Sequence, residues 1–409
     1  MKKKIVSLLT VMALAATTLA GCGSSSSDTA ADTADSTDAA ATEEAGDTDT
    51  AEASTAGLKA GFIFLHDENS TYDLNFMNAA KAACEKMGVE YVAKTNIPEG
   101  QECYDAACEL ADAGCDFIFA DSFGHEDYVI EAAKEYPEVQ FSHATGTKAH
   151  TEGLDNFHNA FASIYDGRYL AGIAAGMKLN EMIADGKITE DTAKVGYVGA
   201  YPYAEVISGF TSFFLGVRSQ CPSATMEVKY TNSWASFDLE KECAESLIAD
   251  KCVLISQHAD TTGAPTACQA AGVPCVGYNI SMIETAPDAA LTSASINWEP
   301  YYEYATKCVI DGTAIDTDWC KGFAEGADKL TDLNDKVVAE GTAEKVKEVE
   351  DAIIDGSLHV FDTSTFTVNG KELTDADSEY ISDGYFHESE KASAPAFDFI
   401  IDGITAVTQ

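Results

Sequence analysis

Apolar residues in most of the chain recur in one repeating unit: a short β-branched or aromatic run, a turn, and an amphipathic stretch of about ten to fifteen residues. This alternation predicts βαβ units and parallel sheets. A first set of strands is predicted at 59–65, 90–95, 116–121 and 140–144. The helices between these strands are predicted at about 73–86, 101–113 and 125–135.

A second set of the same units follows a helix that is predicted around 169–177. Its strands are predicted at 194–199, 227–231, 252–257 and 275–278, each followed by a helix or a helix-like loop. The regularity fades after Asn297. The elements predicted beyond it are helices near 301–311 and 343–355 and a hairpin-like segment at 366–373, turning at Asn369 and Gly370.

Two successive sets of βαβ units predict an α/β fold with two doubly wound, Rossmann-like lobes. The body at 58–409 is also longer than one compact core usually holds. We expect a first lobe at about 58–165 plus a returning segment near 290–320, and a second lobe at about 180–289 plus C-terminal segments. The strand ends of both lobes would then face a shared cleft, as in proteins that close on a ligand.

The N-terminus has the charged-then-apolar order of a secretory signal. Lysines at 2–4 precede an apolar stretch at 5–19, which is too short to span a membrane. The sequence Leu-Ala-Gly-Cys at 19–22 resembles the lipobox of bacterial lipoproteins. Residues 1–21 are therefore predicted to be a lipoprotein signal peptide, with acyl chains on Cys22. An ordinary signal peptide with a chance cysteine is the alternative.

The segment at 23–57 consists almost entirely of Ser, Thr, Ala, Asp and Glu, without aromatic residues, Lys or Arg. It cannot bury enough apolar surface to fold. Together with the lipidated Cys22 it is predicted to form a disordered acidic stalk at 22–57, kept extended by charge repulsion.

The whole chain is strongly acidic, with a formal net charge of −43 at pH 7. Such a surface repels nucleic acid and anionic lipid, so no nucleic-acid partner is expected. The twelve cysteines include no CxxC pair and no Cys/His cluster with zinc spacing, so no metal site is expected. Most are predicted to be small core residues of a protein from a reducing or anaerobic habitat, with one or two disulfides left open.

Catalytic motifs are missing from the sequence. It contains no GxSxG elbow, no P-loop and no dinucleotide fingerprint. His125 and Glu126 begin like a zincin motif, but Val129 stands where the second histidine belongs. His258 and Asp260 follow a predicted strand without a nucleophile or a metal partner. The sequence therefore indicates a protein that is not an enzyme and needs no cofactor.

Several short motifs, in their order and spacing, resemble the basic membrane protein family of ABC-transporter substrate-binding lipoproteins. They lie at 166–172, 195–199, 230–234, 257–263, 276–279 and 290–293. The resemblance implies a fold of the type I periplasmic-binding-protein class and a lipid-anchored protein outside the cell. It would bind a purine nucleoside or nucleobase and deliver it to an ABC permease. The protein would lie on the extracellular face of the cell membrane, or on its periplasmic face if the cell has an outer membrane.

In that family a planar base lies between two aromatic rings, one from each lobe. The resemblance places Tyr72 as the first ring, after the ligand-facing Asp67 and Asn69, and Trp234 as the second. Stacking a base on such a ring contributes roughly 1 to 3 kcal/mol. The alternative is that either ring merely fills a gap between lobe and loop.

Polar residues at strand ends complete the site that the resemblance implies. Asp121 would face the ligand, although a helix N-cap is an equal alternative. His258 and Asp260 end a strand and would point into the cleft, although Asp260 is also a candidate cap. The last two positions, Asn279 and Asn297, lie at or beside departures from the family pattern.

The departures from the family pattern concern the recognition of ribose. Asn279 stands where nucleoside-binding members have an Asp that holds ribose hydroxyls, and Ile296, before Asn297, replaces a Lys. Both changes weaken ribose recognition, and the run Asn-Trp-Glu-Pro-Tyr-Tyr at 297–302 resembles the branch of the family associated with free nucleobases. Two other hypotheses remain open: an extracellular sensor domain for the same ligand class, and a nucleoside hydrolase.

Overall fold

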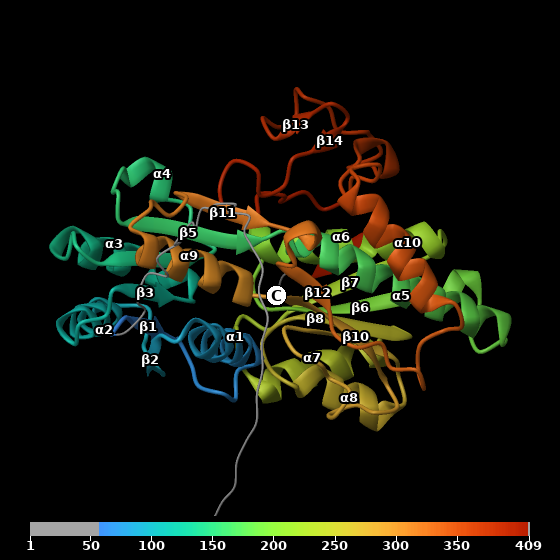
Figure 1. The fold of residues 1–409 in the computed structure, drawn as a ribbon. Helices are drawn as coiled ribbons and strands as arrows, with labels where there is room; N and C mark the ends of the chain where they lie inside the picture. Colours follow the sequence, from blue (N-terminus) through green and yellow to red (C-terminus); the bar gives the residue numbers. More distant parts are fainter. Residues whose placement is uncertain (1–56, 408–409) are drawn as a thin grey trace, which may run out of the picture. The chain divides into compact units, whose positions relative to one another are not determined.

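The computed structural model describes residues 57–407, which contain two large, mainly parallel β-sheets covered by helices (Figure 1). The predicted α/β fold with two doubly wound sheets is confirmed. The predicted signal peptide, Cys22 and the stalk up to residue 56 lie outside the described residues. Within residues 57–407, no helix is long and apolar enough to cross a membrane.

The first sheet has the strand order β2-β1-β3-β4-β5-β11, and all of its pairs are parallel. Its strands are β1 (Lys59–Ile63), β2 (Glu90–Lys94), β3 (Phe117–Ala120), β4 (Gln140–Ala144), β5 (Phe157–Ala162) and β11 (Asp318–Lys321). Helices α1 (Thr71–Met87) and α9 (Glu299–Asp311) pack together on one face, and α2 (Gln101–Asp112) and α3 (Glu126–Glu135) on the other. Two short helices, η1 (Phe123–His125) and α4 (Ala149–Glu152), complete this lobe.

The second sheet has the order β12-β10-β9-β8-β6-β7-β15. Its strands are β6 (Lys194–Gly199), β7 (Thr225–Tyr230), β8 (Leu254–His258), β9 (Cys275–Tyr278), β10 (Ala290–Ile296), β12 (Asp328–Leu330) and β15 (Ile404–Val407). Only β12 runs antiparallel to its neighbour among these pairs. Helices α5 (Ile164–Ala184) and α6 (Ala204–Gln220) cover one face, and α7 (Phe237–Ala249) and α8 (Gly263–Ala271) the other.

The chain passes between the two sheets after β5, after β10 and after β11 (Figure 1). The segment that returns to the first sheet was expected near 290–320. Residues 290–296 form β10 in the second sheet, so the return consists of α9 and β11. Ala290–Ile296 is buried throughout, and parallel pairing with β9 holds it in the second sheet.

The C-terminal part packs against the second lobe. Helix α10 (Thr342–Ile354) lies on α5, and an aromatic cluster that includes Phe361, Phe386 and Phe397 follows it. The short strands β13 (Ile381–Ser382) and β14 (Tyr385–Phe386) pair within this segment. The expected hairpin at 366–373 is reduced to its turn and the bridge between Val368 and Lys371, and the carbonyl oxygen of Thr367 instead accepts from the Asp402 N–H at 2.7 Å.

Helices α5 and α6 approach each other closely through three glycines, Gly172, Gly176 and Gly216. A Cβ on Gly172 would lie 2.1 Å from the carbonyl oxygen of Phe213, and one on Gly216 would lie 2.1 Å from that of Tyr169. Only glycine therefore fits at these positions. The eleven cysteines within the described residues are free thiols, and most of them are buried.

Candidate functional site

A cavity lies between the carboxyl ends of the strands of the two sheets. It is lined by Leu65, His66, Tyr72, Asp73, Ser122, Phe123, Thr145, Glu205, Trp234, His258, Asp260 and Tyr278. About 410 Å³ of space lies between these residues, including the opening to solvent. In both sheets the central strands, β1 beside β3 and β6 beside β8, form the switch point at which doubly wound sheets bind ligands.

Tyr72 lies in the first turn of α1, in the first lobe, and it lines the cavity. The Ser70 hydroxyl caps this helix by accepting a hydrogen bond from the Asp73 N–H at 3.3 Å. The Tyr72 hydroxyl donates to the carbonyl oxygen of Asp121 at 2.9 Å, and its ring lies 4.7 Å from that of Phe76. The Tyr72 side chain is therefore held at its hydroxyl by Asp121 and at its ring by Phe76.

Asp121 lies directly behind this wall and is fully buried. One carboxylate oxygen accepts from the Leu65 N–H at 3.1 Å, and the other has no partner among the described residues. Burial, together with the charge of Asp73, raises its pKa well above the ordinary value. Asp121 thus holds the loop after β1 and does not line the cavity.

Trp234 supplies a wall from the second lobe, in the loop after β7. Its ring meets that of Tyr201 edge-on at 5.3 Å, and Tyr203 lies 6.2 Å away. The carbonyl oxygen of Trp234 accepts from the Asp260 N–H at 2.8 Å. The loops after β7 and β8 are therefore tied to each other.

A polar group forms the base of the cavity, with Glu205 and His258 in its lining and buried Arg168 behind them. Arg168 of α5 donates to the carbonyl oxygen of Gln257 at 2.7 Å, and its guanidinium lies 3.6 Å above the ring of Tyr278. His258 lies 3.5 Å from the Glu205 carboxylate, and neither of its ring nitrogens has a hydrogen-bond partner among the described residues. These unpaired groups are available to a ligand.

Burial shifts the protonation of this group. It raises the pKa of Glu205 to about 7, against the opposing effect of Arg168. Burial, and then the charge of Arg168, lowers the pKa of His258 well below the ordinary value. Near neutral pH the histidine is therefore uncharged, whereas Glu205 exists in both forms.

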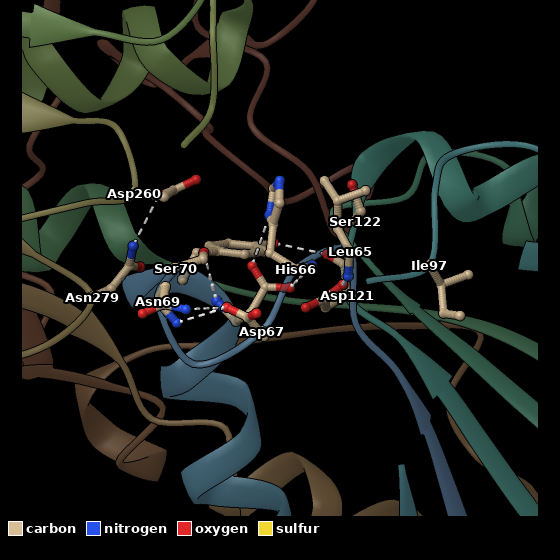
Figure 2. Close-up of polar contacts among 12 residues, drawn as sticks. Leu65, His66, Asp67, Asn69, Ser70, Ile97, Asp121, Ser122, Asp260 and Asn279 are labelled. Carbon is tan, nitrogen blue, oxygen red and sulfur yellow. Dashed lines mark hydrogen bonds and ion pairs between the residues drawn. The ribbon is translucent and has the colours of Figure 1, made fainter. Parts of the chain in front are cut away.

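Asp260 links the two lobes at the cavity. Its carboxylate accepts from the Asn279 side-chain amide at 3.0 Å (Figure 2). Its carbonyl oxygen accepts from the N–H of Thr71, in the first turn of α1, at 2.7 Å. Asn279 has a left-handed backbone, with φ of 67°. It orients Asp260 from behind the cavity wall.

Three other predicted residues lie away from the cavity lining. Asp67 accepts two hydrogen bonds from Asn69, and this pair builds the turn before α1 (Figure 2). The side-chain amide of Asn297 donates to the carbonyl oxygen of Gly326 at 2.9 Å. Asn297 therefore joins the crossing segment after β10 to the one before β12.

The structure thus brings four of the predicted ligand residues together: Tyr72, Trp234, His258 and Asp260. The lining residues that sequence reasoning missed include Glu205, Thr145 and His66. Each follows a strand or starts a helix at the carboxyl edge of a sheet, and this position was the signal that could have identified them. Within residues 57–407, no group of metal-ligating side chains is arranged to hold a metal ion.

A protein-family model described as ABC transporter substrate-binding protein PnrA-like matches residues 60–359. A purine-binding protein of Brucella abortus (strain 2308) is 33% identical over 328 residues, covering 78% of this chain and 89% of that protein. A Haloferax volcanii protein named as an ABC transporter glucose-binding protein is 31% identical over 266 residues, covering 65% of this chain and 64% of its own length.

Solved structures of solute-binding proteins share the fold. An ABC transporter solute-binding protein of Aeropyrum pernix K1 superposes with a TM-score of 0.63 at 18% identity, covering 74% of this chain and 93% of that one. Two doubly wound lobes are therefore arranged here as in the type I periplasmic-binding-protein class, as the sequence predicted.

Proposed function

Because the chain belongs to the family of PnrA-like ABC transporter substrate-binding proteins, we propose that it binds a purine base between its two lobes. Proteins of this kind bind a small solute outside the cytoplasm and work with an ABC permease. The observation that carries the proposal is a cavity with an aromatic wall from each lobe, Tyr72 and Trp234. The similarity to a purine-binding relative supports the same ligand class.

The polar base of the cavity suits the edge of a purine ring. Burial, and then the charge of Glu240, raises the pKa of Asp260 well above the ordinary value, and burial raises the pKa of Glu205 to about 7. Each carboxyl group accepts hydrogen bonds and, when protonated, also donates one. The free nitrogens of His258 supply one donor and one acceptor when the ring is neutral. Purines carry donors and acceptors side by side, so this group matches them better than a ligand with acceptors alone.

We propose further that the base, and not its nucleoside, is the preferred ligand. Asn279 uses its amide to hold Asp260, and Ile296 is 3% exposed and lies in the core. Neither residue is free to bind ribose hydroxyls in the way that the family's Asp and Lys would. Discrimination between ligands should then rest on contacts with the purine ring and not with the sugar.

The test is calorimetric titration with adenine, guanine, hypoxanthine, their nucleosides and glucose. We expect heat from at least one free purine, and a nucleoside affinity no higher than that of its base. Glucose binding without purine binding would favour the chemistry named for the Haloferax relative and would overturn the proposal. Release of free base from a nucleoside would instead support a hydrolase.

We also propose that the protein is anchored to the outer face of the membrane through acyl chains on Cys22. Changing Cys22 to Ser should remove the lipidation site and release the protein into the medium, while purine binding stays intact. Cell fractionation followed by immunoblotting measures the distribution. Membrane retention of Cys22→Ser at the wild-type level would contradict the anchor.

A further inference from the structure

A second cavity adjoins the ligand cavity and shares Phe123, Thr145, Glu205 and Trp234 with it. These four residues line both spaces, so the two cavities lie next to each other at this point. None of the sequence motifs considered above predicts this space.

Most of the second cavity's wall is apolar. Pro202, Tyr203, Ile207, Ala394 and Pro395 line it together with the shared aromatic residues. Phe123 is 51% exposed and Tyr203 is 49% exposed, although large aromatic side chains usually find cover in a folded protein. Exposed aromatic residues from both lobes therefore face a space that an apolar group would fill.

Trp234 lines both cavities, and the ring of Tyr203, which lines the second cavity, lies 6.2 Å from it. Tyr201 lines neither cavity and packs against both rings, with its centroid 5.1 Å from that of Tyr203 and 5.3 Å from that of Trp234. A flat apolar substituent could lie against Trp234 and Tyr203 while the purine ring stays in the first cavity.

The outer wall comes from the C-terminal segment, beyond the family match that ends at residue 359. Buried Glu388 fixes this segment: its carboxylate accepts from the Ser208 hydroxyl at 2.6 Å and from the Phe397 N–H at 2.8 Å. On the other lobe, the Ser393 N–H donates to Asp318 at 3.1 Å. The wall that carries Ala394 and Pro395 is thus held from both lobes.

We propose that the second cavity is a ligand subsite, and that the preferred ligand is a purine carrying an apolar substituent that enters it. This inference rests on the proposed binding of a purine in the first cavity. A sugar is the rival substituent, because Thr145, Thr147, Glu205, Asp398 and the Tyr203 hydroxyl also line the wall, and adenosine tests it. A benzyl group would instead bury its surface against Tyr203 and Pro395.

Calorimetry with adenine, adenosine, N6-benzyladenine and 9-benzyladenine tests the subsite, and the two benzyl positions cover alternative orientations of the ring. We expect at least one benzyl derivative to bind about tenfold or more tightly than adenine, because burying an aromatic group of this size gives such a gain. Adenosine should show no gain. If adenine binds and neither derivative gains, the subsite is wrong and the proposed function stands. If no purine binds, both are wrong.

Two variants test whether the gain in affinity comes from the second cavity. Ala394→Trp should fill the space and Tyr203→Ser should remove an aromatic wall, so each should lower the affinity ratio of benzyl derivative to adenine toward one. Phe237→Ala is the control, since Phe237 is an exposed aromatic residue outside both cavities, and it should keep the wild-type ratio. An undiminished ratio in both Ala394→Trp and Tyr203→Ser would overturn the assignment.

Discussion

The two aromatic walls of the ligand cavity differ in how they are held. Tyr72 is fixed at both ends, by its hydrogen bond to the Asp121 carbonyl oxygen and by Phe76. Trp234 rests on Tyr201 edge-on and leaves its ring available for stacking. Loss of the Trp234 ring should therefore report on the ligand more directly than loss of Tyr72, which would also disturb the loop after β3.

We predict that Trp234→Ala weakens purine binding by roughly 1 to 3 kcal/mol, because it removes one stacking surface. Trp234→Phe keeps a flat ring and should lose much less. Isothermal titration calorimetry with the best-binding purine measures both changes. Equal affinities for the wild type and Trp234→Ala would show that stacking on this ring does not hold the ligand.

Sequence reasoning located some site residues and missed others for identifiable reasons. Tyr72 and Trp234 were found through the resemblance, since each occupies a loop or helix start at the carboxyl edge of a sheet. Arg168 stands in the first half of helix α5, two residues after Asp166 and before a largely apolar stretch, where an arginine is ordinarily expected to reach solvent. The structure instead buries it to 1% exposure beneath the cavity, where the Gln257 carbonyl and the Tyr278 ring stabilise its charge.

At the scale of elements, the α5 and α6 pair depends on glycine. We predict that Gly216→Ala lowers the free energy of unfolding by about 1 to 3 kcal/mol, because its Cβ would meet the Tyr169 carbonyl oxygen and the backbone would have to move. Gly167→Ala in α5 is the matched control. Its Cβ would lie 3.6 Å from the nearest atom, so this change should be neutral or stabilising.

Urea denaturation followed by circular dichroism distinguishes the two glycine variants. A Gly216→Ala protein as stable as Gly167→Ala would mean that the helices separate at little cost. Neither glycine lines the cavity, so each variant should bind purine to the extent that it remains folded.

The alternation of strand and helix patterns predicted most elements of both sheets, and their bounds agree within a few residues. The exceptions have physical reasons. Strand β5 contains His158 and Asn159, whose polar side chains are buried and obscure its pattern. Helix α5 was predicted too short, because it is buried around most of its circumference and shows little amphipathic periodicity. The edge strands β11 and β15 were not predicted, because tertiary packing brings them into place.

Across the whole molecule, buried carboxyl groups should make stability depend on pH. Burial raises the pKa of Asp166 to about 8 and the pKa values of Glu240 and Glu388 to about 7. In the unfolded chain these groups titrate near 4, so between about pH 4 and 8 these three groups bind more protons in the native protein than in the unfolded chain. Buried His125, His143 and His158, whose pKa burial lowers to about 4, act in the opposite direction below about pH 6.5. The free energy of unfolding should therefore fall most clearly as the pH rises from about 6.5 to 8.

Asp166→Asn tests this dependence, because the change removes a buried titrating group of the same shape. We predict that the variant is more stable than the wild type at pH 8, by an amount on the order of 2 kcal/mol, and that the two converge near pH 4. Thermal unfolding from pH 5 to 8 measures the slope. Glu131→Gln, at an exposed position of α3, is the control and should leave the slope unchanged. A wild-type stability that rises with pH from about 6.5 to 8 would contradict the prediction.

The parallel pairing of β15 with β7 also affects solubility. Ile404–Val407 occupies the hydrogen-bonding edge of Met226–Lys229, which would otherwise be an unpaired edge strand. Exposed strand edges recruit strands from other molecules and promote aggregation. A chain shortened before Asp402 would keep both lobes and the ligand cavity, yet it would present β7 as an open template for intermolecular pairing. Strand β15 itself becomes the edge of the sheet, but with four residues against the six of β7 it is a poorer template for pairing with another molecule.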